Sequence, residues 1–114
     1  MASNRQVFTL RTTVSSDDSS NPAYSTAAEL GENFKTGILE VTLGGTTPSW
    51  NVTPLYDNNS DDAFIDGPTL EISGSNGQIF RKKLNLTDVR KFQCRVDGSA
   101  GSAPTINIVL VAFD

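Results

Sequence analysis

Residues 105–114, TINIVLVAFD, decide the fold class of this chain. In a β-strand, successive side chains point to opposite faces. One face of this stretch then carries four apolar residues: Ile106, Ile108, Leu110 and Ala112. The other face carries three apolar residues and one amide: Asn107, Val109, Val111 and Phe113. A strand of an antiparallel sheet normally keeps one polar face toward water, so the second apolar face needs a cover.

Six further segments, working outward from this strand, show strand patterns. They are residues 5–14, 34–43, 48–57, 68–73, 78–86 and 88–97. Turn residues separate most of them, and Asn76-Gly77 predicts a hairpin between residues 68–73 and 78–86. Regularly spaced short strands with almost no helix predict an all-β fold. We expect one domain over residues 1–114, an antiparallel β-sandwich or jelly roll with seven to eight strands.

The segments between these strands give three local predictions. Residues 1–6 are expected to form an N-terminal arm. Residues 15–33 predict a long polar loop that lies over a neighbouring copy or is mobile, with one helical turn at 25–30 that ends at Gly31. Pro54 has no N–H to donate, so residues 48–57 are expected to lie at a sheet edge or to carry a bulge.

The alternation also predicts the hydrophobic core. Ten residues are expected to be largely buried: Leu10, Leu39, Val41, Trp50, Val52, Phe92, Cys94, Val96, Ile106 and Ile108. Cys94 is the single cysteine, so the chain has no internal disulfide. Its neighbours at a spacing of two are Phe92 and Val96, which predicts a buried and unreactive thiol.

Composition argues against several functions. The chain has no histidine, which removes the most common general base and metal ligand and rules out a Ser-His-Asp arrangement within it. A net charge of −4 argues against nucleic-acid binding. No apolar run approaches the ~18 residues of a membrane helix, and the first ten residues lack the apolar core of a signal peptide. We therefore expect a protein made in a cytoplasm, with no enzymatic activity and no cofactor.

Residues 57–67, DNNSDDAFIDG, are the richest group of oxygen ligands. Asp57, Asn59 and Asp61 have the spacing of a calcium loop, but the sixth position is aspartate where glycine is needed, and the twelfth is Pro68 where a glutamate should stand. Acidic loops between strands are usually just solvated. A calcium site is therefore a weak hypothesis, with these candidate ligands: Asp57, Asp61, Asp62 and Asp66.

Residues 81–83, Arg-Lys-Lys, are the one basic run. Alternation puts Arg81 and Lys83 on the same face as Ile79, and Lys82 on the opposite face. Such a run fits a solvated strand that protects a sheet edge from other chains. The functional alternative is a positive patch that docks on an acidic partner, and both interpretations stay open on the sequence alone.

Two stretches, GGTTPSWNVTPLYDNN (44–59) and LTDVRKFQCRVDGSAGSAPTINIVLVAF (86–113), carry a resemblance. Their order of strands and turns resembles small β-sandwich modules of tailed-bacteriophage structural proteins, particularly head decoration (cement) proteins. The resemblance covers about residues 37 to 113, and the long polar loop of the N-terminal third has no counterpart in it. It implies a homotrimer bound to the major capsid protein or another virion protein on the outside of an assembled head.

This resemblance also suggests what covers the last strand. A second copy of the chain, or its 15–33 loop, would pack on Val109, Val111 and Phe113, which with the basic run make up the candidate interface. Arm residues 2–6, the 15–33 loop and Arg81 to Lys83 are expected at the shell. The alternatives are a carbohydrate-binding β-sandwich, for which Tyr24 is the one residue among the single Trp and two Tyr that falls outside the core pattern, and a tail or baseplate subunit.

Overall fold

The fold is known from a computed structural model, which describes residues 5–11, 23–31, 34–46, 48–58, 63–97 and 102–114. These residues form ten strands, all paired antiparallel, and no helix. The strands are β1 (Arg5–Arg11), β2 (Ala23–Tyr24), β3 (Ala28–Glu29), β4 (Thr36–Thr46), β5 (Ser49–Asp57), β6 (Ile65–Asp66), β7 (Leu70–Ser73), β8 (Ile79–Asn85), β9 (Lys91–Asp97) and β10 (Ser102–Phe113). None of the described residues belongs to a helix that could cross a membrane.

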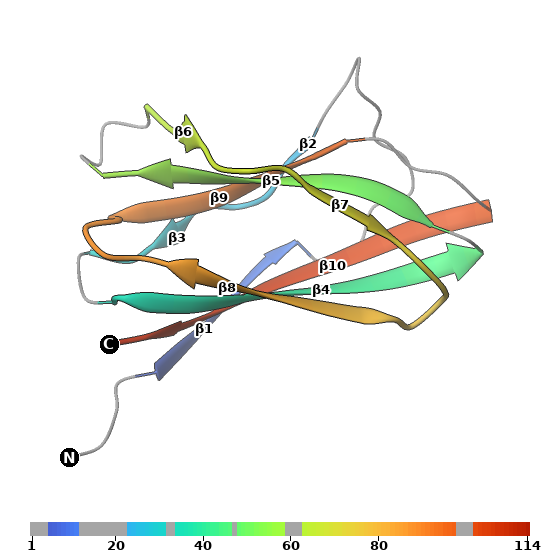
Figure 1. The fold of residues 1–114 in the computed structure, drawn as a ribbon, viewed down its shortest axis with the longest axis horizontal. Helices are drawn as coiled ribbons and strands as arrows, with labels where there is room; N and C mark the ends of the chain where they lie inside the picture. Colours follow the sequence, from blue (N-terminus) through green and yellow to red (C-terminus); the bar gives the residue numbers. More distant parts are fainter. Residues whose placement is uncertain (1–4, 12–22, 32–33, 47, 59–62, 98–101) are drawn as a thin grey trace.

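The strands lie in two sheets that face each other (Figure 1). One has the order β1-β10-β4-β8, and we call it the β10 sheet. The other has the order β2-β9-β5-β6, with β3 also on β9 and β7 also on β5, and we call it the β5 sheet. The prediction of an antiparallel β-sandwich is therefore confirmed. Three of the ten strands have only two residues each, which is too short for a visible alternation and explains why seven to eight strands were expected.

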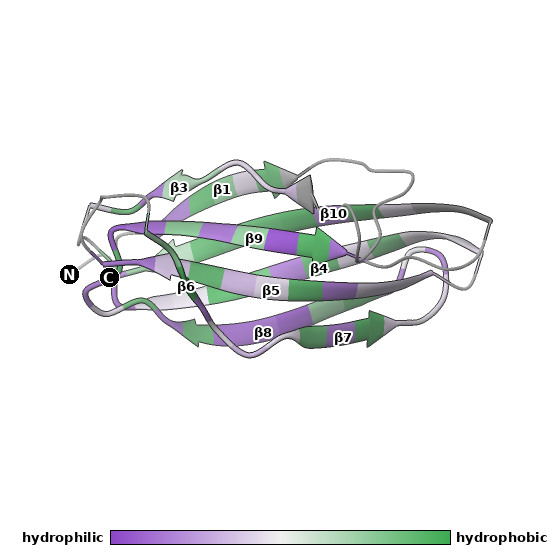
Figure 2. Ribbon diagram, turned by 90° about the horizontal axis from the view of Figure 1, so that it is seen from above, coloured by the Kyte–Doolittle hydropathy of each residue, from purple (hydrophilic) through white to green (hydrophobic). Residues whose placement is uncertain are grey.

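The core lies between the two sheets, and all ten residues predicted for it are at most 4% exposed. Figure 2 shows the alternation of hydrophilic and hydrophobic residues along β9, which matches the alternating burial of that strand. The aromatic rings of Phe8 and Phe34 pack edge to face, with their centroids 6.2 Å apart. Their contact ties β1 to the segment that leads into β4.

The helical turn predicted at residues 25–30 is wrong, because this segment pairs with β9 instead. Ser25 donates its backbone N–H to the carbonyl of Cys94 at 2.8 Å, and its hydroxyl accepts the N–H of Cys94 at 2.9 Å. The N–H of Leu30 reaches the carbonyl of Arg90 at 2.7 Å. The open edge of β9 offers these partners, which a single isolated helical turn cannot match. Gly31 does end the segment, with a φ of 61°.

The hairpin predicted at Asn76-Gly77 is also wrong, although the turn exists. Gly77 has a φ of 83°, but β7 pairs with β5 and β8 pairs with β4, so the turn carries the chain from one sheet to the other. The turn is held on the end of β4: the N–H of Gly77 donates to the carbonyl of Leu43 at 2.7 Å, and Asn76 Oδ1 accepts the N–H of Gly45 at 3.0 Å. An Asn-Gly pair fixes a local reversal but not the partners of its strands.

Pro54 does not place β5 at an edge. Strand β5 pairs with β9 on one side and with both β6 and β7 on the other. Pro54 lies between the residues that pair with β7 and those that pair with β6, and its carbonyl accepts the N–H of Gly67 at 2.8 Å. The missing donor therefore falls in the gap between two short strands, where the ladder needs none.

Candidate interaction surfaces

The outer side of the β10 sheet carries a group of apolar residues that we call the apolar face. The strand register sets Val111 directly between Val7 of β1 and Ile38 of β4, with Val109 and Phe113 next to it along β10. Val7 is 51% exposed, and the other four are partly exposed. The structure thus brings the predicted Val109, Val111 and Phe113 together. Sequence reasoning missed Val7 and Ile38, because only the register between strands shows that they are neighbours.

No described element packs over the apolar face. The six strands outside the β10 sheet all belong to the β5 sheet, which lies on the opposite side, against the core (Figure 1). The two faces of β10 therefore differ sharply in burial. Ile106, Ile108, Leu110 and Ala112 are fully buried, whereas the residues between them keep contact with solvent.

The predicted basic run lies on β8, an edge strand of the β10 sheet, which pairs with β4 alone among the strands that the structure describes. Arg81 donates from Nε to Glu40 Oε2 at 3.0 Å, so its charge is already balanced on the sheet. Lys82 and Lys83 are exposed and have no ion-pair partner among the described residues. Lys35, just before β4, is also exposed and has no ion-pair partner among the residues that the structure describes.

Two hollows follow the same edge. The first is a groove of about 290 Å³ between β8 and β7, and its wall combines core and edge residues: Leu39, Val41, Thr69, Leu70, Glu71, Ile72, Phe80, Arg81 and Lys82. The second is a hollow of about 340 Å³ lined by Lys35, Thr36, Lys83, Leu84 and Asn85. The groove exists because β7 and β8 belong to different sheets and leave the side of the sandwich open between them.

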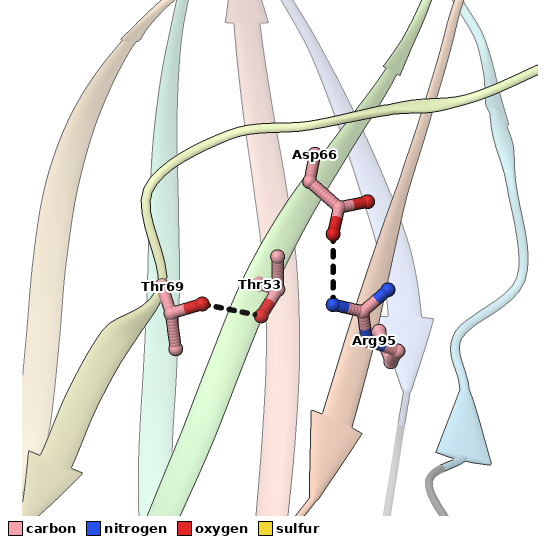
Figure 3. A network of polar contacts seen from close by, with 4 residues as sticks. All are labelled: Thr53, Asp66, Thr69 and Arg95. Carbon is pink, nitrogen blue, oxygen red and sulfur yellow. Dashed lines mark hydrogen bonds and ion pairs between the residues drawn. The ribbon is translucent and has the colours of Figure 1, made fainter.

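A network of polar contacts lies on the β5 sheet (Figure 3). Asp66 Oδ2 accepts a hydrogen bond from Arg95 Nη2 at 2.9 Å, and the hydroxyls of Thr53 and Thr69 lie 2.9 Å apart. The bond to Asp66 raises the pKa of Arg95, and a smaller contribution comes from Tyr24. Tyr24, which pairs with Arg95 across the strands, is 55% exposed.

The acidic residues proposed as calcium ligands are only partly described. Asp57 is fully buried on β5, and Asp66 is engaged with Arg95. Asp61 and Asp62 lie outside the described residues. Within the described ranges no three His, Cys, Asp or Glu residues are grouped to hold a metal. The calcium site stays a prediction.

Cys94 is buried in the core, as predicted. Burial raises the pKa of its thiol from 9.0 to about 12. The thiolate is the nucleophile in cysteine chemistry, so a thiol with this pKa is unreactive at neutral pH.

No protein-family model and no curated protein matches the chain. Solved structures do resemble it. The SPBc2 prophage-derived protein YomS is 13% identical with a TM-score of 0.65, over 100% of this chain and 96% of that one. A chain of the T13 IBDV viral particle is 13% identical with a TM-score of 0.60, and one of the infectious bursal disease virus Gx strain is 11% identical with a TM-score of 0.55.

These matches establish a shared β-sandwich fold and nothing more, because identities of 11% to 13% are too low to carry a function across. Nearly the whole of this chain is covered in each match: 98% in the T13 particle and 96% in the Gx strain. It spans only about a third of the two IBDV chains, 32% and 33%. The class defined by the fold is therefore a single antiparallel β-sandwich.

Proposed function

We propose that this chain is a structural subunit of a virus particle: a decoration (cement) protein that binds the outer surface of an assembled bacteriophage head and stabilises it. In this role it forms a homotrimer, acts without catalysis or a cofactor, and has the major capsid protein or another virion protein as its partner. It is made in the host cytoplasm and ends in the virion.

The apolar face is the single observation that carries this proposal. Val7, Ile38, Val109, Val111 and Phe113 join into a continuous apolar patch over three neighbouring strands, on a side that no described element covers. Contiguous apolar surface of this kind is typical of protein contact sites. Further copies of the chain are the occupants that we propose for it.

The fold neighbours give secondary support. They come from a prophage and from virus particles, and both fit a chain that works by assembly. Assembly also explains how small contacts suffice, because a linked trimer that attaches at several points exceeds the affinity of one module by ~10²–10⁴. A protein that binds the finished lattice but not its free subunits stabilises that lattice by mass action.

The test compares particles with and without this chain. The protein is removed from purified particles or its gene is deleted, and both forms are heated while the release of their contents is followed. We expect the decorated particles to rupture at the higher temperature. Equal rupture temperatures would refute the cement role.

One observation favours a second candidate, a carbohydrate-binding module for host recognition or on a tail or baseplate. Tyr24 is an exposed aromatic side chain next to an arginine and a carboxylate, Arg95 and Asp66. Aromatic rings with neighbouring polar groups suit ligands that have both apolar and hydroxyl surfaces. Binding of host surface glycans that is lost in Tyr24→Ala and kept in Val111→Ala would favour this alternative.

A further inference from the structure

The open side of the sandwich between β7 and β8 combines three features that belong together. Within the described part of the chain, one edge of β8 is unpaired, the groove beside it has an apolar wall, and Lys82 and Lys83 lie along it without an ion-pair partner. We propose that β8 is the docking site for an extended acidic segment of a partner protein, which adds to the β10 sheet as a further strand.

The unpaired backbone supplies the first part of the argument. Among the described residues β8 bonds to β4 on one side only, and none of them takes up the N–H and C=O groups on its other side. An extended peptide that joins such an edge gains main-chain hydrogen bonds, and pockets for alternate side chains give the selectivity.

The groove supplies the second part. Leu70 and Phe80 are partly exposed at its mouth, although both pack against the core. Alternate residues of an added strand would point inward, so those residues should be apolar and fill the groove. Its volume of about 290 Å³ gives room for such side chains.

The positive charges of β8 indicate which other residues the added strand should carry. Residues of the added strand that point outward would lie beside Lys83 and beside Arg81, whose charge Glu40 already balances, while Lys82 lines the groove. Opposite charges directly across neighbouring strands are favourable, and like charges are unfavourable. The occupant is therefore a strand of alternating apolar and acidic residues.

The β10 sheet of a second copy does not fit this edge. The β10 sheet ends in β1 at one edge and in β8 at the other, and Arg5 at the β1 edge is also positive. Pairing β8 with β8, or β8 with β1, would bring cations together. The edges thus resist self-association, as edge lysines commonly do, while the same charges attract an acidic strand from elsewhere.

This inference deepens the proposed function, because β8 is among the segments expected at the shell, but its test needs no particle. The probe is a soluble eight-residue peptide of alternating valine and glutamate. The controls are a valine–lysine peptide of the same pattern and a peptide with four glutamates followed by four valines. Binding is followed by NMR titration of the backbone amides of the full chain. We expect the alternating acidic peptide alone to bind, with shifts on β8 and β7.

Two matched charge reversals on the same sheet locate the site. Lys83→Glu on β8 should raise the Kd of the valine–glutamate peptide about 10-fold, because a favourable cross-strand pair becomes a repulsive one. Arg5→Glu on β1 should change it less than about 2-fold. Both side chains are exposed, so both variants should keep the fold, and their amide spectra check this.

Several results would overturn the proposal: no binding of the alternating peptide, equal binding to both variants, or shifts centred on β1. Tighter binding of a single-stranded DNA decamer than of the peptide, with the same loss in Lys83→Glu, would also overturn it and assign the edge to phosphate chains. Failure here with decorated particles that still resist heat would leave the cement role intact. Binding of the alternating peptide, together with decorated particles that rupture at the same temperature as bare ones, would support the docking site on β8 and refute the cement role.

Discussion

The outer faces of the two sheets differ in how far the chain itself covers them. On the β5 sheet, the outward-facing Thr53 and Leu55 are only 2% and 3% exposed, although they point away from the core. The segment around β6 runs along β5, and Asp66 and Thr69 bond across its outer side (Figure 3). On the β10 sheet, Val7 and its neighbours keep contact with solvent.

The difference shows which apolar residues the fold itself requires. Leu55 is an outward apolar residue that the chain buries with its own atoms, so its burial contributes to the stability of the single molecule. The apolar face has no comparable cover among the described residues, so its burial must wait for another molecule. Substitutions on the two faces should therefore affect different measurements, folding for one and association for the other.

The largest expected effect is on the covered face. Leu55→Ala should lower the free energy of unfolding by about 2–5 kcal/mol, because a buried leucine loses both its transfer free energy and its packing. Val111→Ala on the apolar face should lower it by at most about 1 kcal/mol, since the side chain is only partly buried. Urea denaturation at a protein concentration low enough to dissociate any oligomer measures both changes for the single chain. Equal losses would show that the faces do not differ as described.

A glycine next to β6 tests how closely that segment packs on β5. A Cβ on Gly67 would lie 2.8 Å from the ring of Tyr56 and 3.1 Å from Cγ of Pro54. Gly67→Ala should therefore cost about 1–3 kcal/mol through overpacking. Gly77→Ala is a useful comparison, since nothing lies within 4 Å of its added Cβ and only its positive φ of 83° opposes the change. A neutral Gly67→Ala would mean that the segment around β6 lies loosely on β5.

Cys94 tests the interior that lies between the two faces. Its thiol has a pKa of about 12 in the folded chain against 9.0 for an ordinary thiol, so the folded state holds its proton more tightly than the unfolded state. This contribution to stability is fully present below pH 9 and is lost as the pH rises from 9 toward 12.

Between pH 8 and pH 10 the wild-type chain should lose about 1 kcal/mol more unfolding free energy than Cys94→Ala, which has no thiol to ionise. Groups other than Tyr56, whose pKa is raised by burial and in part by Cys94, titrate similarly in both proteins and cancel in the difference. Denaturant unfolding at the two pH values measures it. Parallel losses in both proteins would place the thiol in contact with water and contradict a dry interior.

The sequence predicted what depends on alternation within one strand and failed where the partner of a strand mattered. All ten core residues follow from their parity along the chain. The partners of β7 and β8 do not, because Asn76-Gly77 sets only a local reversal, and the end of β4 then holds that turn. The predicted hairpin concealed the groove, since β7 and β8 leave an opening only when they join different sheets.

The same limit applies to the apolar face. Parity alone put Val109, Val111 and Phe113 on the second side of β10, and this prediction did not need the structure. Val7 and Ile38 complete the patch through register with two other strands, one of them about 70 residues away and the other about 100 residues away in sequence. A two-residue strand such as β3 has no periodicity at all, so the pairing of residues 28–29 with β9 was read as a helical turn.

The smallest expected effect on folding should come with the largest effect on association. Val111→Thr keeps the branched shape that suits a strand and replaces one methyl with a hydroxyl, which can reach solvent on this face. We expect the unfolding free energy to change by less than about 1 kcal/mol. The oligomer, in contrast, would have to bury that hydroxyl between copies without a provided partner, which is costly. Light scattering should therefore show a multimer for the wild type and a shift toward the 12.2 kDa chain for the variant. Asn107→Thr, on the same side of β10 but already polar and exposed, is the matched control and should leave the solution mass unchanged. If the wild-type chain stays at 12.2 kDa at micromolar concentration, a second copy does not cover the apolar face in solution. The surface on which the protein assembles would then have to cover it.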